Sequence, residues 1–386
     1  MYTLLIAIIY LAFISLGLPD SLLGSAWPIM HADINVPLSL MGLISIIVSG
    51  GTIISSLFSD KLIRKFGTQA ITTVSIFLTA IALLGFSYST NIWMIIAFAI
   101  PYGFGAGAID AALNNYVALH YSSKHMSWLH CFWGVGTIIS PFVMSYSLTN
   151  YTWSVGYRIV AFIQVSIAIV LLISKPLWKI HKQSPNDTVE EHNNLGLMGA
   201  LKIKGVKQLL VGFASYCAAE GTAMAWSCTY LVEAKQMDEV KAAAFASLFF
   251  IGMTVGRFLS GFITNRLGDK KMIFVGGAIA FLGVILILLP SNNINLSLIG
   301  LVILGLGCAP IYPSIIHSTP ENFGAENSGS IIGIQMAGAY TGAILFPPLF
   351  GVISKLLGFH VLPIYIGVFM ALTMIMLKQT FNLTSK

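Results

Sequence analysis

Residues 103–115 read GFGAGAIDAALNN, and they place an aspartate, Asp110, within an apolar run that begins near Ile92. A carboxylate in hydrocarbon is costly, and it usually faces a polar partner or a water-filled cavity. Gly103 and Gly107 are one helical turn apart, which predicts a small-residue face for close packing against another helix. A phosphate-binding glycine loop is disfavoured, because it needs a preceding strand and a following helix in a soluble unit.

The composition identifies the solvent around that run. Hydrophobic residues make up 56% of the 386 residues and charged residues only 9%, whereas a soluble domain carries roughly 25% charged residues. A packed core cannot absorb this deficit of charge, so the outer surface must be apolar too, and a lipid bilayer is its natural solvent. The four cysteines show neither metal-ligand spacing nor a disulfide framework. We predict no metal site and no cofactor.

Twelve runs are long and apolar enough to cross a membrane, which takes about 20 residues in a helix. They cover residues 3–30, 38–63, 69–88, 91–118, 126–149, 155–177, 206–232, 240–264, 271–290, 295–318, 327–354 and 359–378. We therefore predict an all-α membrane protein with twelve transmembrane helices.

A long polar segment divides these spans into two sets of six. We predict an N-terminal six-helix bundle over residues 1–177, a cytoplasmic linker over 178–205 and a C-terminal six-helix bundle over 206–386. The two bundles are expected to be pseudo-symmetric, because related halves joined in this way are the layout of many secondary transporters.

Basic residues predict the orientation, since cytoplasmic loops carry an excess of Lys and Arg. With the N-terminus in the cytoplasm, that side holds fifteen basic residues and the other side holds four, namely Arg158, Lys235, Lys241 and Lys355. Both termini are therefore expected in the cytoplasm. The net charge of +6 follows from this topology, and we predict no nucleic-acid partner.

The two halves repeat a loop motif. SLFSDKLIRKFG at residues 56–67 follows the second span, and SGFITNRLGDKK at residues 260–271 follows the eighth. With the number of spans, this motif resembles the major facilitator superfamily over essentially the whole chain. The resemblance implies a cytoplasmic gate motif that latches one conformation, whereas simple positive-inside topology is the alternative. The gate residues would be Asp60, Arg64, Asn265 and Arg266.

Three acids, Asp20, Asp110 and Glu220, lie deep inside predicted spans. Asn114 shares a helix face with Asp110. His130 lies at similar depth on the next antiparallel span, which predicts an Asp110–His130 contact. Burial disfavours the charged form of a carboxylate, and a carboxyl that titrates near neutrality can carry a proton across the membrane. We predict proton coupling at Asp110, with the other two acids and His130 as further candidates. A structural carboxylate that cross-links helices is the alternative.

Several stretches narrow the resemblance to the fucose–proton symporter group and to related glucose-type symporters. GFGAGAIDAALNN is similar to the fourth span of the fucose group, in which an acid precedes an asparagine by four residues, as Asp110 precedes Asn114. YCAAEGTAMAWSCTYL at residues 216–231 looks like the seventh span of the glucose-type group. Acids of the first and fourth spans handle the proton in fucose symporters, which implies that role for Asp20 and Asp110.

A sugar site needs polar groups for the hydroxyls and an aromatic face for the ring. The polar candidates at mid-span are Asn114, Asn115, Gln164, Glu220, Gln335 and Tyr340, and the aromatic candidates are Trp133, Tyr216, Trp226 and Tyr312. An unpaired amide in lipid is costly, so each amide should face the cavity or another helix. Hydrogen bonding between helices is therefore the alternative for each amide.

These observations favour a proton-coupled importer of a sugar or similar polyhydroxylated solute that works by alternating access. Sodium is the alternative coupling ion. A drug or metabolite exporter working by proton antiport and a lipid or glycolipid flippase are the rival transporters. A membrane enzyme is not expected, since no nucleophile–base pair or nucleotide loop is found. We expect a monomer in a bacterial cytoplasmic (inner) membrane.

Overall fold

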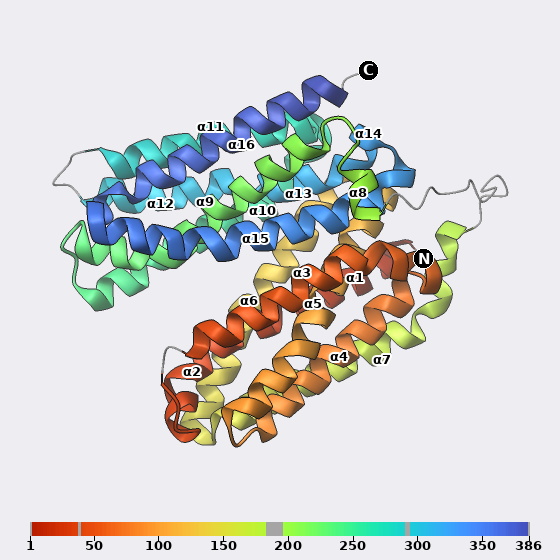
Figure 1. Cartoon of the computed structure of the whole chain (residues 1–386), viewed down its shortest axis with the longest axis horizontal. Helices are drawn as coiled ribbons and strands as arrows, with labels where there is room; N and C mark the ends of the chain where they lie inside the picture. Colours follow the sequence, from red (N-terminus) through yellow and green to blue (C-terminus); the bar gives the residue numbers. More distant parts are fainter. Residues whose placement is uncertain (1, 38–39, 183–195, 290–293, 385–386) are drawn as a thin grey trace. The chain divides into compact units, whose positions relative to one another are not determined.

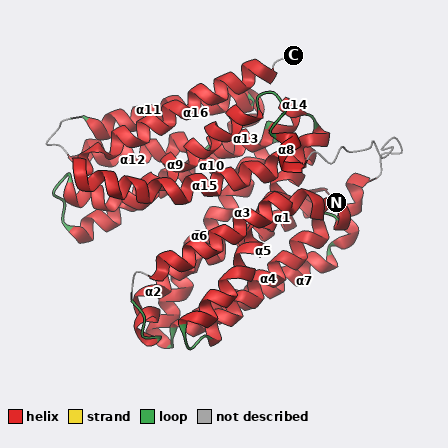
Figure 2. Ribbon diagram, viewed as in Figure 1, coloured by secondary structure: helices red, strands yellow, loops and turns green. Residues whose placement is uncertain are grey.

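The computed structural model describes residues 2–37, 40–182, 196–289 and 294–384, so part of the predicted linker lies outside the described residues (Figure 1). The described chain is helical, and no strand occurs in it (Figure 2). It divides into two compact units. Unit 1 comprises Met1–Tyr116 and Leu129–Asn194, and unit 2 comprises Val117–Trp128 and Leu195–Lys386. The segment 117–128 thus groups with the later part of the chain.

The first half of the chain forms seven α-helices in the described residues. They are α1 (Tyr2–Asp20), α2 (Leu22–Asp33), α3 (Leu40–Phe66), α4 (Thr68–Tyr88), α5 (Ile92–His120), α6 (Ser123–Asn150) and α7 (Trp153–Ile173), and a 3-10 helix, η1 (Lys175–Lys182), follows them. The sixth span was predicted to reach residue 177, but α7 ends at Ile173. Pro176 accounts for this end, because proline disfavours a helical conformation in the residue before it.

The second half of the described chain contains nine α-helices and one 3-10 helix. They are α8 (Gly196–Ala200), α9 (Val206–Glu233), α10 (Glu239–Leu267), α11 (Asp269–Leu288), α12 (Ile294–Cys308), α13 (Ile311–His317), α14 (Thr319–Phe323), α15 (Ala325–Leu357), η2 (Phe359–Val361) and α16 (Leu362–Thr384). Within unit 2, α9 packs against α15 and α16, and α12 packs against α10 and α11.

The helices have the length and composition of membrane spans. Eleven segments among the described residues are long and apolar enough to cross a bilayer. The helix α9, with 28 residues, is not among these eleven segments but has the length of a twelfth span. Large apolar side chains such as Phe142 (73% exposed) and Val74 (62% exposed) lie on the outside. The predicted all-α membrane fold is therefore confirmed.

Two predicted continuous spans are broken. The first span divides at Ser21, between α1 and α2, and the tenth divides after Cys308, where α12 ends and α13 begins at Ile311. Pro19 and Pro310 lie at these breaks. Proline lacks the N–H group that a continuing helix requires. Irregular backbone at membrane depth is tolerated where it is buried in protein or lines a cavity. Both breaks are therefore candidate positions for a functional site.

The predicted packing face on α5 is confirmed. A Cβ atom on Gly103 would overlap the Val48 carbonyl oxygen of α3, and one on Gly107 would overlap the Thr52 carbonyl oxygen. The Thr52 hydroxyl donates to the Gly103 carbonyl at 3.2 Å. Small residues let membrane helices approach closely, and here they fix the position of the α5 segment that carries Asp110.

Candidate functional site

Asp20 lies at the break between α1 and α2. One carboxylate oxygen accepts a hydrogen bond from Trp133 Nε1 at 2.8 Å, and the other accepts from the Tyr102 hydroxyl at 3.3 Å. A close approach of α1 and α6 positions the tryptophan, because a Cβ on Gly17 would overlap the Trp133 carbonyl oxygen. Asp20 is exposed. The predicted candidates Asp20 and Trp133 are therefore direct partners within unit 1.

Asp110 lies in a buried polar chain in unit 1. Asn114 Nδ2 donates to Asp110 Oδ1 at 2.7 Å, and Asn114 Oδ1 lies 3.1 Å from His130 Nε2. Asp110 is 4% exposed, Asn114 0% and His130 5%. Because a carbonyl oxygen only accepts, Nε2 of His130 must carry the hydrogen. Asn114 thus links the two residues that the sequence predicted to meet, and a direct contact between them stays a prediction.

Gln164 is fully engaged between helices of unit 1. Its Nε2 donates to the Ser15 carbonyl of α1 at 2.8 Å, and its Oε1 accepts from the Thr79 hydroxyl of α4 at 2.5 Å. Gln164 is 1% exposed. This geometry matches the helix–helix alternative for the amide, and a role in solute binding stays a prediction. Asn115, next to Asn114 on α5, is half-buried.

In unit 2, Glu220 of α9 pairs with Arg257 of α10. Arg257 Nη2 lies 3.2 Å from Glu220 Oε1, and the two side chains are 5% and 12% exposed. Arg257 lies inside the predicted eighth span and was not among the predicted site residues. Charges within a membrane usually pair with one another, so the coexistence of one Arg and one Glu in neighbouring spans was the signal that identifies this pair.

The break between α12 and α13 is linked to α9 by a tyrosine. The Tyr216 hydroxyl donates to the Cys308 carbonyl at 2.9 Å, which satisfies an acceptor that the end of α12 leaves without a partner within the helix. The Tyr216 and Tyr312 rings meet edge to face with centroids 6.3 Å apart. These two predicted aromatics therefore lie side by side at the break.

The remaining candidates in unit 2 lie along α9 and α15. Trp226 Nε1 donates to the Pro347 carbonyl at 2.8 Å, and the Trp226 ring packs on Phe350 at 5.7 Å between centroids. Gln335 Oε1 accepts from the Thr319 hydroxyl at 3.0 Å. Gln335 Nε2 is buried and has no hydrogen-bond partner among the described residues. Tyr340 is half-buried on α15.

The predicted gate residues occupy helix ends. Asp60 and Arg64 form a bidentate pair on α3, with nitrogen–oxygen distances of 3.1 and 2.9 Å. Asn265 and Arg266 are exposed at the end of α10. The Asn265 side-chain oxygen accepts from the Lys124 backbone N–H at 3.3 Å. Their role as a latch stays a prediction.

A second polar cluster, in unit 2, was not predicted from the sequence. Asp269 accepts from the Ser123 hydroxyl, and its other oxygen lies 2.6 Å from His317 Nδ1. His317 Nε2 lies 2.9 Å from the Tyr121 carbonyl oxygen. Both ring nitrogens thus face acceptors, so either His317 is doubly protonated or Asp269 carries the proton. The cluster explains why the segment 117–128 groups with unit 2.

Together these observations define a multi-pass helical membrane protein with polar side chains buried inside its spans. The model of the Major Facilitator Superfamily matches residues 9–290 and 208–381. The chain belongs to this superfamily, and it is a membrane transporter of small-molecule solutes.

The named relatives have low sequence identity to this chain. Bypass of stop codon protein 6 of Saccharomyces cerevisiae is 23% identical over 93% of this chain and 79% of that protein. The glucose/mannose transporter GlcP of Bacillus subtilis is 23% identical over 79% of this chain and 77% of that protein. The structure of the E. coli fucose:proton symporter FucP matches with a TM-score of 0.77 at 18% identity, over 98% of both chains, which establishes a common fold.

Proposed function

We propose that this transporter takes up a sugar or a similar polyhydroxylated solute together with protons, by alternating access. The observation that carries the proposal is the buried chain from Asp110 through Asn114 to His130. A membrane-buried carboxyl that is linked through an amide to a histidine is suited to bind and release a proton. Relatives named for glucose, mannose and fucose transport support the choice of a sugar.

The geometry suggests how the proton and the solute are coupled. The ionised carboxylate of Asp110 holds the Asn114 amide by a charge-assisted hydrogen bond, which is roughly twice as strong as a neutral one. Protonation removes that charge and weakens the bond, so the Asn114 amide becomes able to reorient toward a solute hydroxyl. When the proton leaves, the ionised carboxylate of Asp110 again holds the Asn114 amide, and this favours release of the solute.

Unit 2 supplies further groups suited to a polyhydroxylated solute. Gln335 Nε2 is a buried donor with no partner among the described residues, and such a donor costs roughly 1–3 kcal/mol. A solute hydroxyl that accepts from it recovers this energy. Tyr312 is half-buried at the break after α12, where it meets the buried Tyr216 ring, and it offers an aromatic group to a solute. The positive-inside distribution supports cytoplasmic termini, and a bacterial inner membrane is the location that we propose.

The test is transport by the purified protein in liposomes under an inward proton gradient. Internal pH is followed while hexoses, pentoses and deoxysugars are added one at a time, with cationic dyes as the contrast set. We expect one sugar to trigger acidification of the lumen. Movement of a dye against the proton flow, with no response to any sugar, would replace this proposal with a proton-driven exporter.

A further inference from the structure

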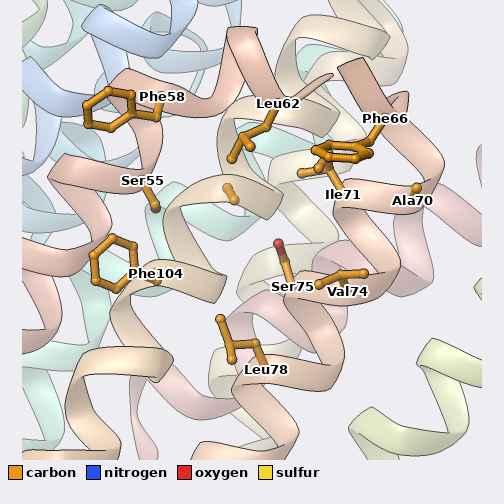
Figure 3. Close-up of a pocket in the computed structure, with 11 residues that line it drawn as sticks. Ser55, Phe58, Leu62, Phe66, Ala70, Ile71, Val74, Ser75, Leu78 and Phe104 are labelled. Carbon is orange, nitrogen blue, oxygen red and sulfur yellow. The ribbon is translucent and has the colours of Figure 1, made fainter. Parts of the chain in front are cut away.

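An apolar groove opens on the side of unit 1 between α3, α4 and α5 (Figure 3). Its volume is about 550 Å³, within the roughly 300–1,000 Å³ of typical ligand pockets. Small buried side chains, Ser55, Ser75 and Ala108, lie at its base. Exposed aromatic side chains form its edge, with Phe58 and Phe66 53% and 55% exposed. The groove is therefore deep at its centre and open to the surroundings.

The position of the groove identifies what surrounds it. The three helices have the length and composition of membrane spans, and the exposed apolar edge of the groove suits contact with lipid. From Ser55 to Phe66 it follows α3 for twelve residues, which is a rise of about 16 Å between the first and the last. One leaflet of the hydrocarbon core is about 15 Å thick. The groove thus has the length of a single leaflet and ends where α3 ends.

Positive charge is placed at that end of the groove. Lys61 Nζ lies 6.0 Å from the ring centroid of Phe58, and Lys65 Nζ lies 5.1 Å from that of Phe66. Both lysines are exposed. Asp60 is held by Arg64, and neither lysine forms a salt bridge within the described residues. Two unneutralised ammonium groups therefore stand over the aromatic edge of an apolar groove.

We propose that this groove binds an anionic phospholipid, with one acyl chain lying between α3, α4 and α5 and the phosphate bound by Lys61 and Lys65. The apolar lining suits the chain, and the length of one leaflet suits its reach. The charges select an anionic headgroup, because the cytoplasmic leaflet carries anionic lipids that attract basic groups beside a membrane span. The site is independent of the transported solute.

The test uses the purified full-length protein after removal of lipid in detergent. Phosphatidylglycerol or phosphatidylcholine is added, and retained lipid is counted by native mass spectrometry. We expect one phosphatidylglycerol to be retained by the wild type. Ala70→Trp, which fills the groove, should lose it, whereas Ala97→Trp, at an exposed alanine of α5 outside the groove, should keep it. Lys61→Gln with Lys65→Gln should abolish the preference over phosphatidylcholine.

If Ala70→Trp and Ala97→Trp retain phosphatidylglycerol equally, the lipid does not bind in the groove. If the wild type retains phosphatidylglycerol and phosphatidylcholine equally, the contact is ordinary bulk lipid and the proposal is wrong. A measurement without mutation guards against a variant that fails to fold. Phosphatidylglycerol with a photoreactive acyl chain is crosslinked to the wild type, and the labelled peptides are mapped. Labels concentrated in residues 55–78 and around Phe104 support the groove, and labels spread evenly over the spans contradict it.

Discussion

The three acids inside the spans have different partners, and this separates their chemistry. Asp110 is held by a neutral amide, Asp20 by a tryptophan and a tyrosine, and Glu220 by the guanidinium of Arg257. Protonation of Glu220 would leave a buried guanidinium without its counter-charge, which is costly. Because this cost weighs against proton exchange at Glu220, we test Asp110 first.

Asp110→Asn tests whether Asp110 carries the coupled proton. The amide keeps the size and a hydrogen-bonding oxygen for Asn114, but it cannot carry a proton. We expect complete loss of proton-driven accumulation, while solute exchange without a gradient persists in the same liposomes. Asp33→Asn is the matched control, because Asp33 of α2 also accepts a side-chain hydrogen bond, from Trp153 at 2.7 Å. Full accumulation by Asp110→Asn would remove the proton role from this residue.

The Glu220–Arg257 pair predicts a dependence between two mutations. Glu220→Gln alone leaves the Arg257 charge buried, and breaking a buried pair in this way costs about 3–5 kcal/mol of stability. The double variant Glu220→Gln with Arg257→Gln removes both charges and should recover most of the loss. Thermal unfolding in detergent measures the stability of the single variants and of the double variant. If the two losses simply add, the residues are not coupled and the pair has no structural role.

At the scale of the element, the contact between α3 and α5 depends on glycine. Gly103→Ala places a methyl group against the Val48 carbonyl, and backbone cannot move aside as a side chain can. We expect a loss of roughly 1–3 kcal/mol, as for other overpacked contacts. Gly50→Ala on α3 is the control, since nothing lies within 4 Å of a Cβ there, and its expected effect is a gain of up to about 1 kcal/mol. Equal unfolding temperatures for the two variants would contradict the close contact.

Some features of the helices can be predicted from the sequence, and others cannot. Spans follow directly from apolar runs, and the glycine face of α5 follows from spacing. The breaks at Ser21 and after Cys308 are not predicted, because hydropathy continues through both. The Asp269–His317 cluster joins residues 48 positions apart, and no local pattern encodes such a pairing. For the same reason the partners of Gln164 on α1 and α4 emerge only from the packed helices.

The whole molecule distributes polarity in the manner of a membrane protein. Large apolar side chains cover the outside of the spans, while hydroxyl groups such as those of Ser56 and Thr79 are buried between helices. Basic residues then decide which way the chain crosses the bilayer, because they are retained on the cytoplasmic side. The orientation is thus a property of the whole sequence, and it can be tested at the two ends of one helix.

Lys241 lies in the first turn of the 29-residue helix α10, and Lys270 lies in the first turn of α11, just after α10 ends; both side chains are exposed. The helix is about 43 Å long, more than the roughly 30 Å of the hydrocarbon core, so it is long enough for its ends to reach opposite surfaces. In a variant without the four native cysteines, a membrane-impermeant maleimide should label Lys241→Cys on intact cells. It should label Lys270→Cys only after permeabilisation. The reverse pattern would invert the predicted topology, and labelling of both on intact cells would mean that α10 does not cross the membrane.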